Sequence, residues 1–146
     1  MSQQNVDLVR SLYAAWNRRD TDEWLSFLAP DIVFRPVPTF TDSQERRGLD
    51  AMRRWMVEWF EVWADDHSTQ PESIRGYGDA VIALLRFTGH ARASGVEVAG
   101  GIFEVFRFRD GRIVSVEDFT DRAEALNAAG TRPRHLRPGA GGLGDV

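Results

Sequence analysis

The sequence lacks two residue types on which many enzymes depend. It has no cysteine, which excludes disulfide bonds, thiolate metal ligands and cysteine nucleophiles. It has no lysine either, because all 18 basic residues are arginine, and this removes Schiff-base chemistry and a lysine-bound pyridoxal cofactor. The three histidines do not have the spacing of metal ligands, so we expect no metal and no other cofactor.

The chain also lacks long apolar runs and an excess of positive charge. No run approaches the roughly 18 apolar residues of a membrane span, and the N-terminus has no charged-then-apolar signal pattern, so we expect a soluble, cytoplasmic protein without a membrane partner. The net charge of −4 argues against nucleic acid as a partner. At 146 residues the chain fits one domain with one core.

Five tryptophans and nine phenylalanines are present to fill a core or a cavity. Hydrophobic periodicity in the first half of the chain predicts mainly helices. The predicted elements are a helix over 4–17, a short helix capped by Asp20 and stopped by Pro30, a strand in 31–37 and a helix over 49–64. The stretch between the strand and the last of these helices is predicted to be a polar loop.

The second half of the chain predicts antiparallel strands over 68–77, 80–93, 97–109 and 112–120, followed by a helix over 121–129. Asp110 and Gly111 form a strong hairpin signal between the last two strands. Helices grouped before strands indicate an α+β domain, with helices packed on one face of a sheet. We place this domain at residues 1–130 and expect the Gly/Pro/Arg-rich tail, 131–146, to be disordered.

Two acidic residues lie on strand faces that are otherwise apolar. Side chains alternate across a strand, which puts Glu104 beside Ile102 and Phe106, and Asp118 beside Val116. A core-facing carboxylate costs several kcal/mol unless it has a partner or is neutral. These acids therefore either point to solvent or line a cavity that uses them.

The same alternation of side chains predicts that Arg86, Thr88 and His90 lie on the face of Glu104 and Asp118. Hydrogen-bonding groups placed among apolar ones are typical of a ligand pocket. Each residue also has a simpler interpretation. Asp118 could cap the last helix, Glu104 could pair with an arginine such as Arg86 or lie at an edge, and His90 could be structural or exposed.

Both faces of the sheet are rich in apolar residues, so we also predict a homodimer through its outer face.

Three stretches together resemble a known family. The run "LVRSLYAAWNRRDTDEWLSFLAPDIVFRP", the helix after "RRG" and the run "FEVFRFRDGRIVSVEDFTD" are similar to the SnoaL-like branch of the nuclear transport factor 2-like superfamily, over roughly residues 5–130. The resemblance implies a cone-shaped α+β barrel, in which a curved, antiparallel or mixed sheet wraps around the N-terminal helices and a central helix to enclose a hydrophobic cavity. One such scaffold hosts many reactions.

Ketosteroid isomerases and limonene-epoxide hydrolases of this superfamily each imply a set of acid-base residues. The isomerase tyrosine, base and acid donor correspond here to Leu12, Pro36 and Glu104, so the base is missing. The hydrolase Arg-x-Asp pair corresponds to Arg86 and Thr88, so half of that dyad is missing too.

The last-strand aspartate of the hydrolases corresponds to Asp118. SnoaL-type cyclases rely on a single acid-base aspartate, for which Asp118 is again the counterpart. First-helix aromatic residues line the cavity in related proteins, which singles out Trp16.

These arguments give one leading hypothesis and two alternatives. The leading one is a cofactor-independent acid-base enzyme, an isomerase, cyclase or hydrolase acting on a small hydrophobic molecule. Its predicted catalytic residues are Asp118, Glu104, His90 and Arg86, and its predicted substrate contacts are Trp16, Tyr13, Trp59, Thr88 and Phe106. The alternatives are a binding module without chemistry, and a dimerisation unit whose cavity has collapsed around its aromatic residues.

Overall fold

Four helices and six strands make up the computed structural model, which describes residues 2–37 and 44–130. In chain order they are α1 (Ser2–Asn17), α2 (Thr21–Ser26), β1 (Leu28–Arg35), β2 (Arg46–Arg47), α3 (Leu49–Val62), β3 (Ser68–Tyr77), β4 (Ala80–His90), β5 (Glu97–Arg109), β6 (Arg112–Phe119) and α4 (Arg122–Gly130). The predicted disordered tail, 131–146, lies outside the described residues.

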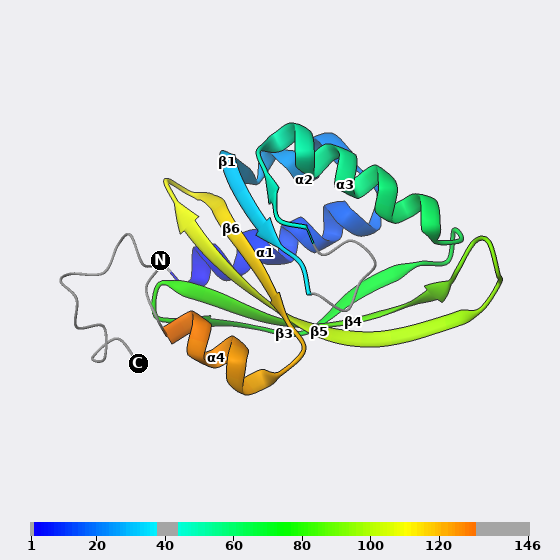
Figure 1. Cartoon of the computed structure of the whole chain (residues 1–146). Coiled ribbons are helices and arrows are strands. Elements are labelled where there is room, and N and C mark those ends of the chain that lie inside the picture. Colours follow the sequence, from blue (N-terminus) through cyan, green and yellow to red (C-terminus); the bar gives the residue numbers. More distant parts are fainter. Residues whose placement is uncertain (1, 38–43, 131–146) are drawn as a thin grey trace.

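The strands form one mixed sheet in the order β2-β1-β6-β5-β4-β3. Neighbouring strands are antiparallel except for β1 and β6, which are parallel. The sheet is strongly curved but does not close, and α1, α2 and α3 lie over its concave side while α4 lies under the opposite face (Figure 1). The predicted α+β architecture, a curved sheet wrapped around helices, is confirmed.

Local sequence signals account for several boundaries. Asp20 caps α2, since its carboxylate accepts a hydrogen bond from the backbone N–H of Glu23 at 3.2 Å. Asp110 and Gly111 both have positive φ angles, 53° and 76°, which a tight hairpin turn requires. Pro30 was expected to stop α2, but the helix ends earlier and Pro30 lies inside β1. The two-residue β2 falls in the region that was predicted to be a loop.

The main core lies between the concave face of the sheet and the first three helices. Its largest fully buried side chains include Phe106, Ile32, Met56 and Ile113. The end of α1 is tied to β3 because Asn17 donates to the carbonyl of Thr69 at 2.8 Å and accepts from the Thr69 backbone N–H at 3.0 Å. This pair of hydrogen bonds helps to hold α1 over the concave face of the sheet.

The opposite face of the sheet carries a second, smaller apolar cluster. Ala125 and Ala129 of α4 pack there against Ala80 and Val105. This helix covers part of the face on which the homodimer contact is expected, and that contact stays a prediction. No helix within 2–37 or 44–130 has the length and apolar character needed to span a bilayer.

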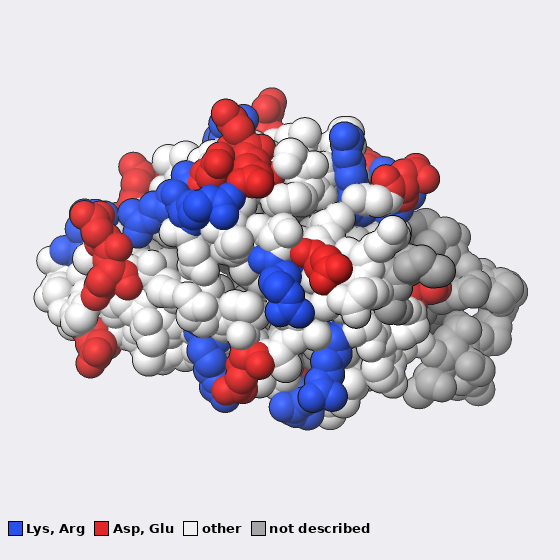
Figure 2. All heavy atoms as spheres, turned by 180° about the vertical axis from the view of Figure 1, so that it is seen from behind, with Lys and Arg blue, Asp and Glu red and all other residues white. Residues whose placement is uncertain are grey.

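Figure 2 shows the molecule from behind. Arginine and acidic side chains are interspersed there among uncharged residues, and no continuous basic surface is visible on this face.

Replacing Ile32 by alanine should lower the free energy of unfolding by about 2–5 kcal/mol, because its side chain is fully buried in the main core and a cavity would be left. Urea denaturation measures this loss. Val57→Ala is the matched control, since Val57 is 51% exposed on α3, and it should change stability by no more than about 0.5 kcal/mol. Similar losses for both variants would contradict the placement of the core.

Candidate functional site

Glu104 and Asp118 lie directly opposite each other on neighbouring strands. The register of β5 and β6 pairs Glu104 with Asp118, and the register of β4 and β5 pairs Glu104 with Ala83. Directly opposed residues point to the same face of a sheet. Both acids line the same cavity on the concave side, which is the shared face that was predicted for them, and their catalytic role stays a prediction.

A β-bulge brings the two acids together. Next to the turn, Arg109 pairs with Arg112 and Phe108 with Ile113, a register that would place Glu104 opposite Glu117 if it continued. The register shifts between Arg107 and Phe108, and one extra residue of β6 moves Asp118 opposite Glu104. Bulges often re-aim side chains beside active sites, and this one has that effect.

Tyr13 of α1 completes the cluster. Its hydroxyl donates a hydrogen bond to Oε1 of Glu104 at 2.7 Å, and its side chain is almost wholly buried. Tyr13 was predicted as a substrate contact, whereas Leu12 was matched to the isomerase tyrosine. The structure places Tyr13, the residue after Leu12, against Glu104.

Burial sets the protonation state of this cluster. The pKa of Asp118 is raised well above its ordinary value of 3.8, first by burial, then by the charge of Glu104 and a side-chain hydrogen bond with it. Burial and the same negative charge also raise the pKa of Tyr13. Two carboxyl groups so close together cannot both ionise readily. The raised pKa therefore favours the neutral, protonated form of Asp118.

One oxygen of this pair has no hydrogen-bond partner. Oδ1 of Asp118 is buried and has no hydrogen-bond partner in the described structure. A buried polar atom without a partner costs about 1–3 kcal/mol, so this position is held at a cost in stability. The atom belongs to a residue that lines the cavity.

The cavity has a volume of about 530 Å³ and is largely apolar. Its walls include Leu12, Tyr13, Trp16, Trp24, Phe34, Pro36, Trp55, Trp59, Trp63, Leu85, Phe87, Ile102, Phe106 and Val116. A volume of this size lies within the range of small-molecule sites, which counts against a collapsed cavity in a pure dimerisation unit.

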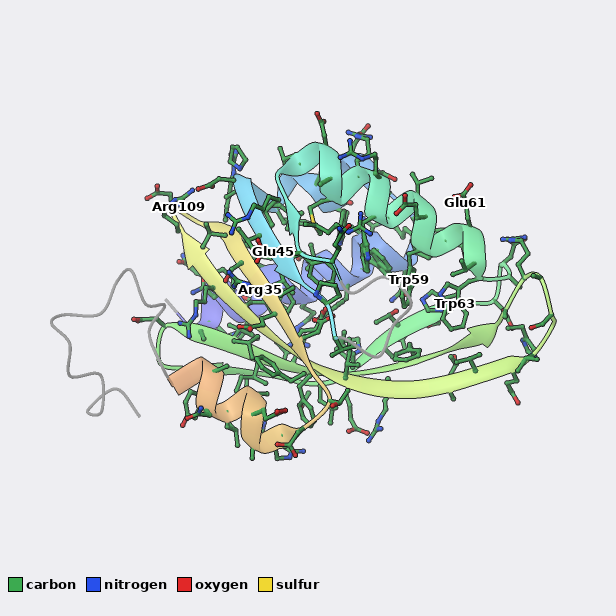
Figure 3. The ribbon with its side chains drawn as sticks, in the orientation of Figure 1. Arg35, Glu45, Trp59, Glu61, Trp63 and Arg109 are labelled. Atoms are coloured by element: carbon green, nitrogen blue, oxygen red, sulfur yellow. The ribbon has the colours of Figure 1, made fainter. Side chains whose placement is uncertain are left out.

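Aromatic rings form the wall under the helices. The ring of Trp16 lies 5.4 Å from those of both Trp24 and Trp55, and Trp55 stacks on Trp59 at 5.5 Å with an interplanar angle of 27°. Trp59 of α3 and Trp63, the residue directly after that helix, point toward the sheet, whereas Glu61 of α3 points away (Figure 3). Of the predicted substrate contacts, Tyr13, Trp16, Trp59 and Phe106 all line the cavity.

The predicted face was wrong for three residues of β4. Because Ala83 is opposite Glu104, the odd-numbered residues Leu85 and Phe87 face the cavity, and the even-numbered Arg86, Thr88 and His90 do not line it. Arg86 lies 3.4 Å from Glu72 on the surface.

His90 pairs instead with Asp66, whose carboxylate raises the pKa of the imidazole. The simpler interpretation of His90, an exposed residue, therefore fits the structure. Asp118 does not cap the last helix either, since the backbone N–H of Glu124 donates to Asp121.

Sequence reasoning missed a buried histidine behind the aromatic wall. His67 stacks on Trp63 with ring centroids 4.3 Å apart, and its Nε2 accepts a hydrogen bond from the indole N–H of Trp59 at 3.1 Å. Burial lowers its pKa to about 4, so it is neutral at pH 7. Gly89 allows this packing, because a Cβ there would lie 3.0 Å from both His67 and Trp63.

Two charged residues at the cavity were also missed. Arg46 of β2 and Glu58 of α3 both line it and lie 3.7 Å apart. The tandem Arg46 and Arg47 gives no periodicity from which the inward residue could be identified. Within the described ranges, no group of three or more acidic or histidine side chains is placed to hold a metal ion.

Asp118→Asn should lose less stability than the wild type when the pH is raised from 5 to 8. Folding raises the pKa of the Asp118 carboxyl. The free energy of unfolding therefore falls as the pH rises above the ordinary pKa of an aspartate, because the carboxyl ionises in the unfolded chain before it does in the folded one. The amide has no such titration, so urea denaturation at the two pH values should show a smaller loss in the variant. Asp79→Asn, in an exposed turn, is the control and should keep the wild-type dependence. Equal pH dependence in Asp118→Asn and wild type would refute the buried neutral acid.

Comparison with known proteins identifies the scaffold. The family model described as a SnoaL-like domain matches residues 9–116. No curated protein sequence gives a significant match.

Among solved structures, an NTF2-like protein of unknown function from Burkholderia pseudomallei K96243 has a TM-score of 0.71 at 24% identity, covering 85% of this chain and 95% of that one. A protein from Jannaschia sp. CCS1 assigned as a SnoaL-like polyketide cyclase has a TM-score of 0.72 at 22% identity, covering 91% and 96%.

TerC, co-crystallised with polyporic acid, has a TM-score of 0.71 at 18% identity, covering 85% of this chain and 98% of its own. At these identities the solved structures establish the fold alone.

Proposed function

The chain belongs to the SnoaL-like domain family, and on that scaffold we propose that it is a cofactor-independent acid-base enzyme acting on a small hydrophobic ketone or related compound. The observation that carries the proposal is the pairing of Glu104 and Asp118 in a largely apolar cavity, with Tyr13 bonded to Glu104. Titratable pairs held in opposite protonation states suit simultaneous proton removal and donation.

The proposed reaction is a proton shift. Glu104, the charged member, takes a proton from the carbon next to a substrate carbonyl. Asp118, the neutral member, turns its single O–H from Glu104 to the carbonyl oxygen and gives up that proton. The substrate becomes its enol, Glu104 becomes neutral and Asp118 becomes charged. A proton then returns from Glu104 to Asp118 along their shared hydrogen bond, so the step balances with no oxidant or reductant.

The surroundings favour this step in two ways. Apolar walls would leave little water around a bound substrate, which would strengthen the interaction of its carbonyl with the acid. The Tyr13 hydroxyl, which donates a hydrogen bond to Glu104, fixes the orientation of the carboxylate that takes the proton. The enol or enolate formed is the intermediate common to isomerisation and to ring closure by carbon–carbon bond formation.

The walls indicate the kind of substrate. Stacked indoles favour flat, apolar ring systems, and the cavity has room for a molecule of a few rings. The polyketide cyclase assignment of one structural neighbour and the polyporic acid bound to another are consistent with such compounds.

Glu104→Gln should reduce turnover about 10²–10⁴-fold, because the amide cannot accept the proton. The assay follows exchange of the α-protons of 1-indanone and α-tetralone for deuterium by NMR. Asp118→Asn should lose a comparable factor through loss of the acid. Glu117→Gln is the matched control, since Glu117 is the neighbouring acid on β6 and does not line the cavity. Wild-type rates of deuterium exchange in both Glu104→Gln and Asp118→Asn would rule out this mechanism.

A binding module is the second candidate, and one observation favours it. The position matched to the isomerase base holds Pro36, a cavity residue that cannot move a proton. If the cavity only binds, the two ketones will bind with unchanged affinity in the site variants and the wild type will not exchange their protons.

A further inference from the structure

His67 contacts three residues of the cavity wall and does not line the cavity itself. Its ring stacks on that of Trp63 with centroids 4.3 Å apart. Its Nε2 lies 3.1 Å from the indole nitrogen of Trp59 and 3.3 Å from the hydroxyl oxygen of Thr69. Trp59, Trp63 and Thr69 all line the cavity. One side chain behind the wall therefore holds three residues that a ligand would meet.

The contact with Trp59 requires a neutral imidazole. An indole nitrogen can only donate, so Nε2 of His67 accepts its hydrogen and the hydrogen of the imidazole lies on Nδ1. Burial lowers the pKa of His67 to about 4, which keeps the ring neutral at pH 7. An apolar side chain could fill the same space but could not accept this hydrogen bond. Histidine at this position therefore orients Trp59 as well as packing against it.

The segment that carries His67 is tied to β4. The backbone N–H of Ala64 donates to the carbonyl of His90 at 2.8 Å. A Cβ at Gly89 would lie 3.0 Å from the Cα of His67 and 3.0 Å from the ring of Trp63, so a larger residue there would push the stacked pair away from the strand. The position of the imidazole is thus set by the backbone as well as by its own contacts.

The contacts of His67 lie away from the two acids along the sheet. Thr69 is opposite Phe87 on β4, and Phe87 is opposite Gly100 on β5. Glu104 is four residues further along β5, which at about 3.3 Å per residue is roughly 13 Å. The ring of Phe87 lies 6.2 Å from that of Trp63, so aromatic side chains from both sides of the cavity meet there. The cavity therefore has an acid end and an aromatic end.

We propose that His67 is a positioning residue for the substrate, because it fixes the indoles of Trp59 and Trp63 at the aromatic end. The substrate class is then an apolar ketone of about three fused rings, with its carbonyl at the acids and its far ring at these indoles, roughly 13 Å along the sheet. A wall that is fixed before the ligand arrives binds more tightly, since less side-chain freedom is lost on binding. This inference rests on the proposed function for the position of the carbonyl, and on the contacts of His67 for the far ring.

The binding test compares α-tetralone with tetrahydrophenanthren-1-one, which is the same ketone with one further fused benzene ring. Isothermal titration calorimetry should show that the wild type binds the three-ring ketone at least about tenfold more tightly, because its far ring buries apolar surface at the indoles. His67→Phe keeps a ring that can stack on Trp63 but has no acceptor for Trp59. It should reduce the preference about three- to tenfold, as loss of one hydrogen bond allows, and change α-tetralone binding less than about twofold.

Matched variants isolate the hydrogen bond. His67→Gln restores an acceptor and should recover part of the preference, whereas His67→Met, a second apolar replacement, should lose it as His67→Phe does. His90→Gln is the control, since His90 pairs with Asp66 outside the cavity, and it should retain the full preference. NMR should show that the indole N–H of Trp59 exchanges with deuterium at least about tenfold faster in His67→Phe than in the wild type. A role in packing alone would not give recovery in His67→Gln.

The outcomes separate this inference from the proposed reaction. Equal binding of the two ketones by the wild type, binding of neither, or a full preference in His67→Phe would each overturn the role of His67. At saturating α-tetralone, the rate of deuterium exchange should be the same in His67→Phe and the wild type, because the acids are at the other end of the cavity. A wild type that prefers the three-ring ketone but exchanges no α-protons refutes only the reaction.

Discussion

The site depends on two carboxyl groups that the sheet forces together in an apolar cavity. Water would allow Glu104 and Asp118 to ionise independently, but burial makes a second negative charge expensive, and the pKa of Asp118 rises as a result. One proton is then held between two acids of unequal surroundings. Tyr13 contributes to this inequality, because its hydroxyl donates to Glu104 and leaves Oδ1 of Asp118 without a partner.

The rest of the fold keeps this arrangement in register and covers it with apolar side chains. The bulge between β5 and β6 brings Asp118 opposite Glu104, and the bonds between Asn17 and Thr69 help hold α1, and with it Tyr13, across the concave face. The tryptophans of α1, α2 and α3 close the cavity from above. A folding unit that needed only a core could have filled this space, and about 530 Å³ of it is open.

Much of the fold and part of the site could be predicted from the sequence. Strand alternation and apolar neighbours were enough to select Glu104 and Asp118, because each acid is an exception on its own strand. Alternation put the two acids on one face but did not predict that they lie opposite each other, because the bulge that brings them there cannot be recognised in the sequence. Without the bulge, the turn at Asp110 and Gly111 would have placed Glu117 there instead.

The sequence alone could not place residues whose position depends on contacts between distant segments of the chain. The face of β4 is fixed by its pairing with β5, and a slip of one residue in that register exchanges the two faces. Arg86, Thr88 and His90 were assigned to the wrong face for this reason. His67 and Arg46 come from segments too short or irregular to show a period, and only the fold brings them to the aromatic wall and the cavity.

The most direct test of the account is the protonation state of Asp118 at neutral pH. Carbon-13 NMR of the side-chain carboxyl groups, titrated from pH 4 to pH 9, reports each carboxyl separately. The account predicts one carboxyl signal that stays protonated at pH 7 and is missing from the Asp118→Asn variant. If every carboxyl carbon has titrated by pH 6, Asp118 is an ordinary ionised aspartate and the shared-proton account is wrong.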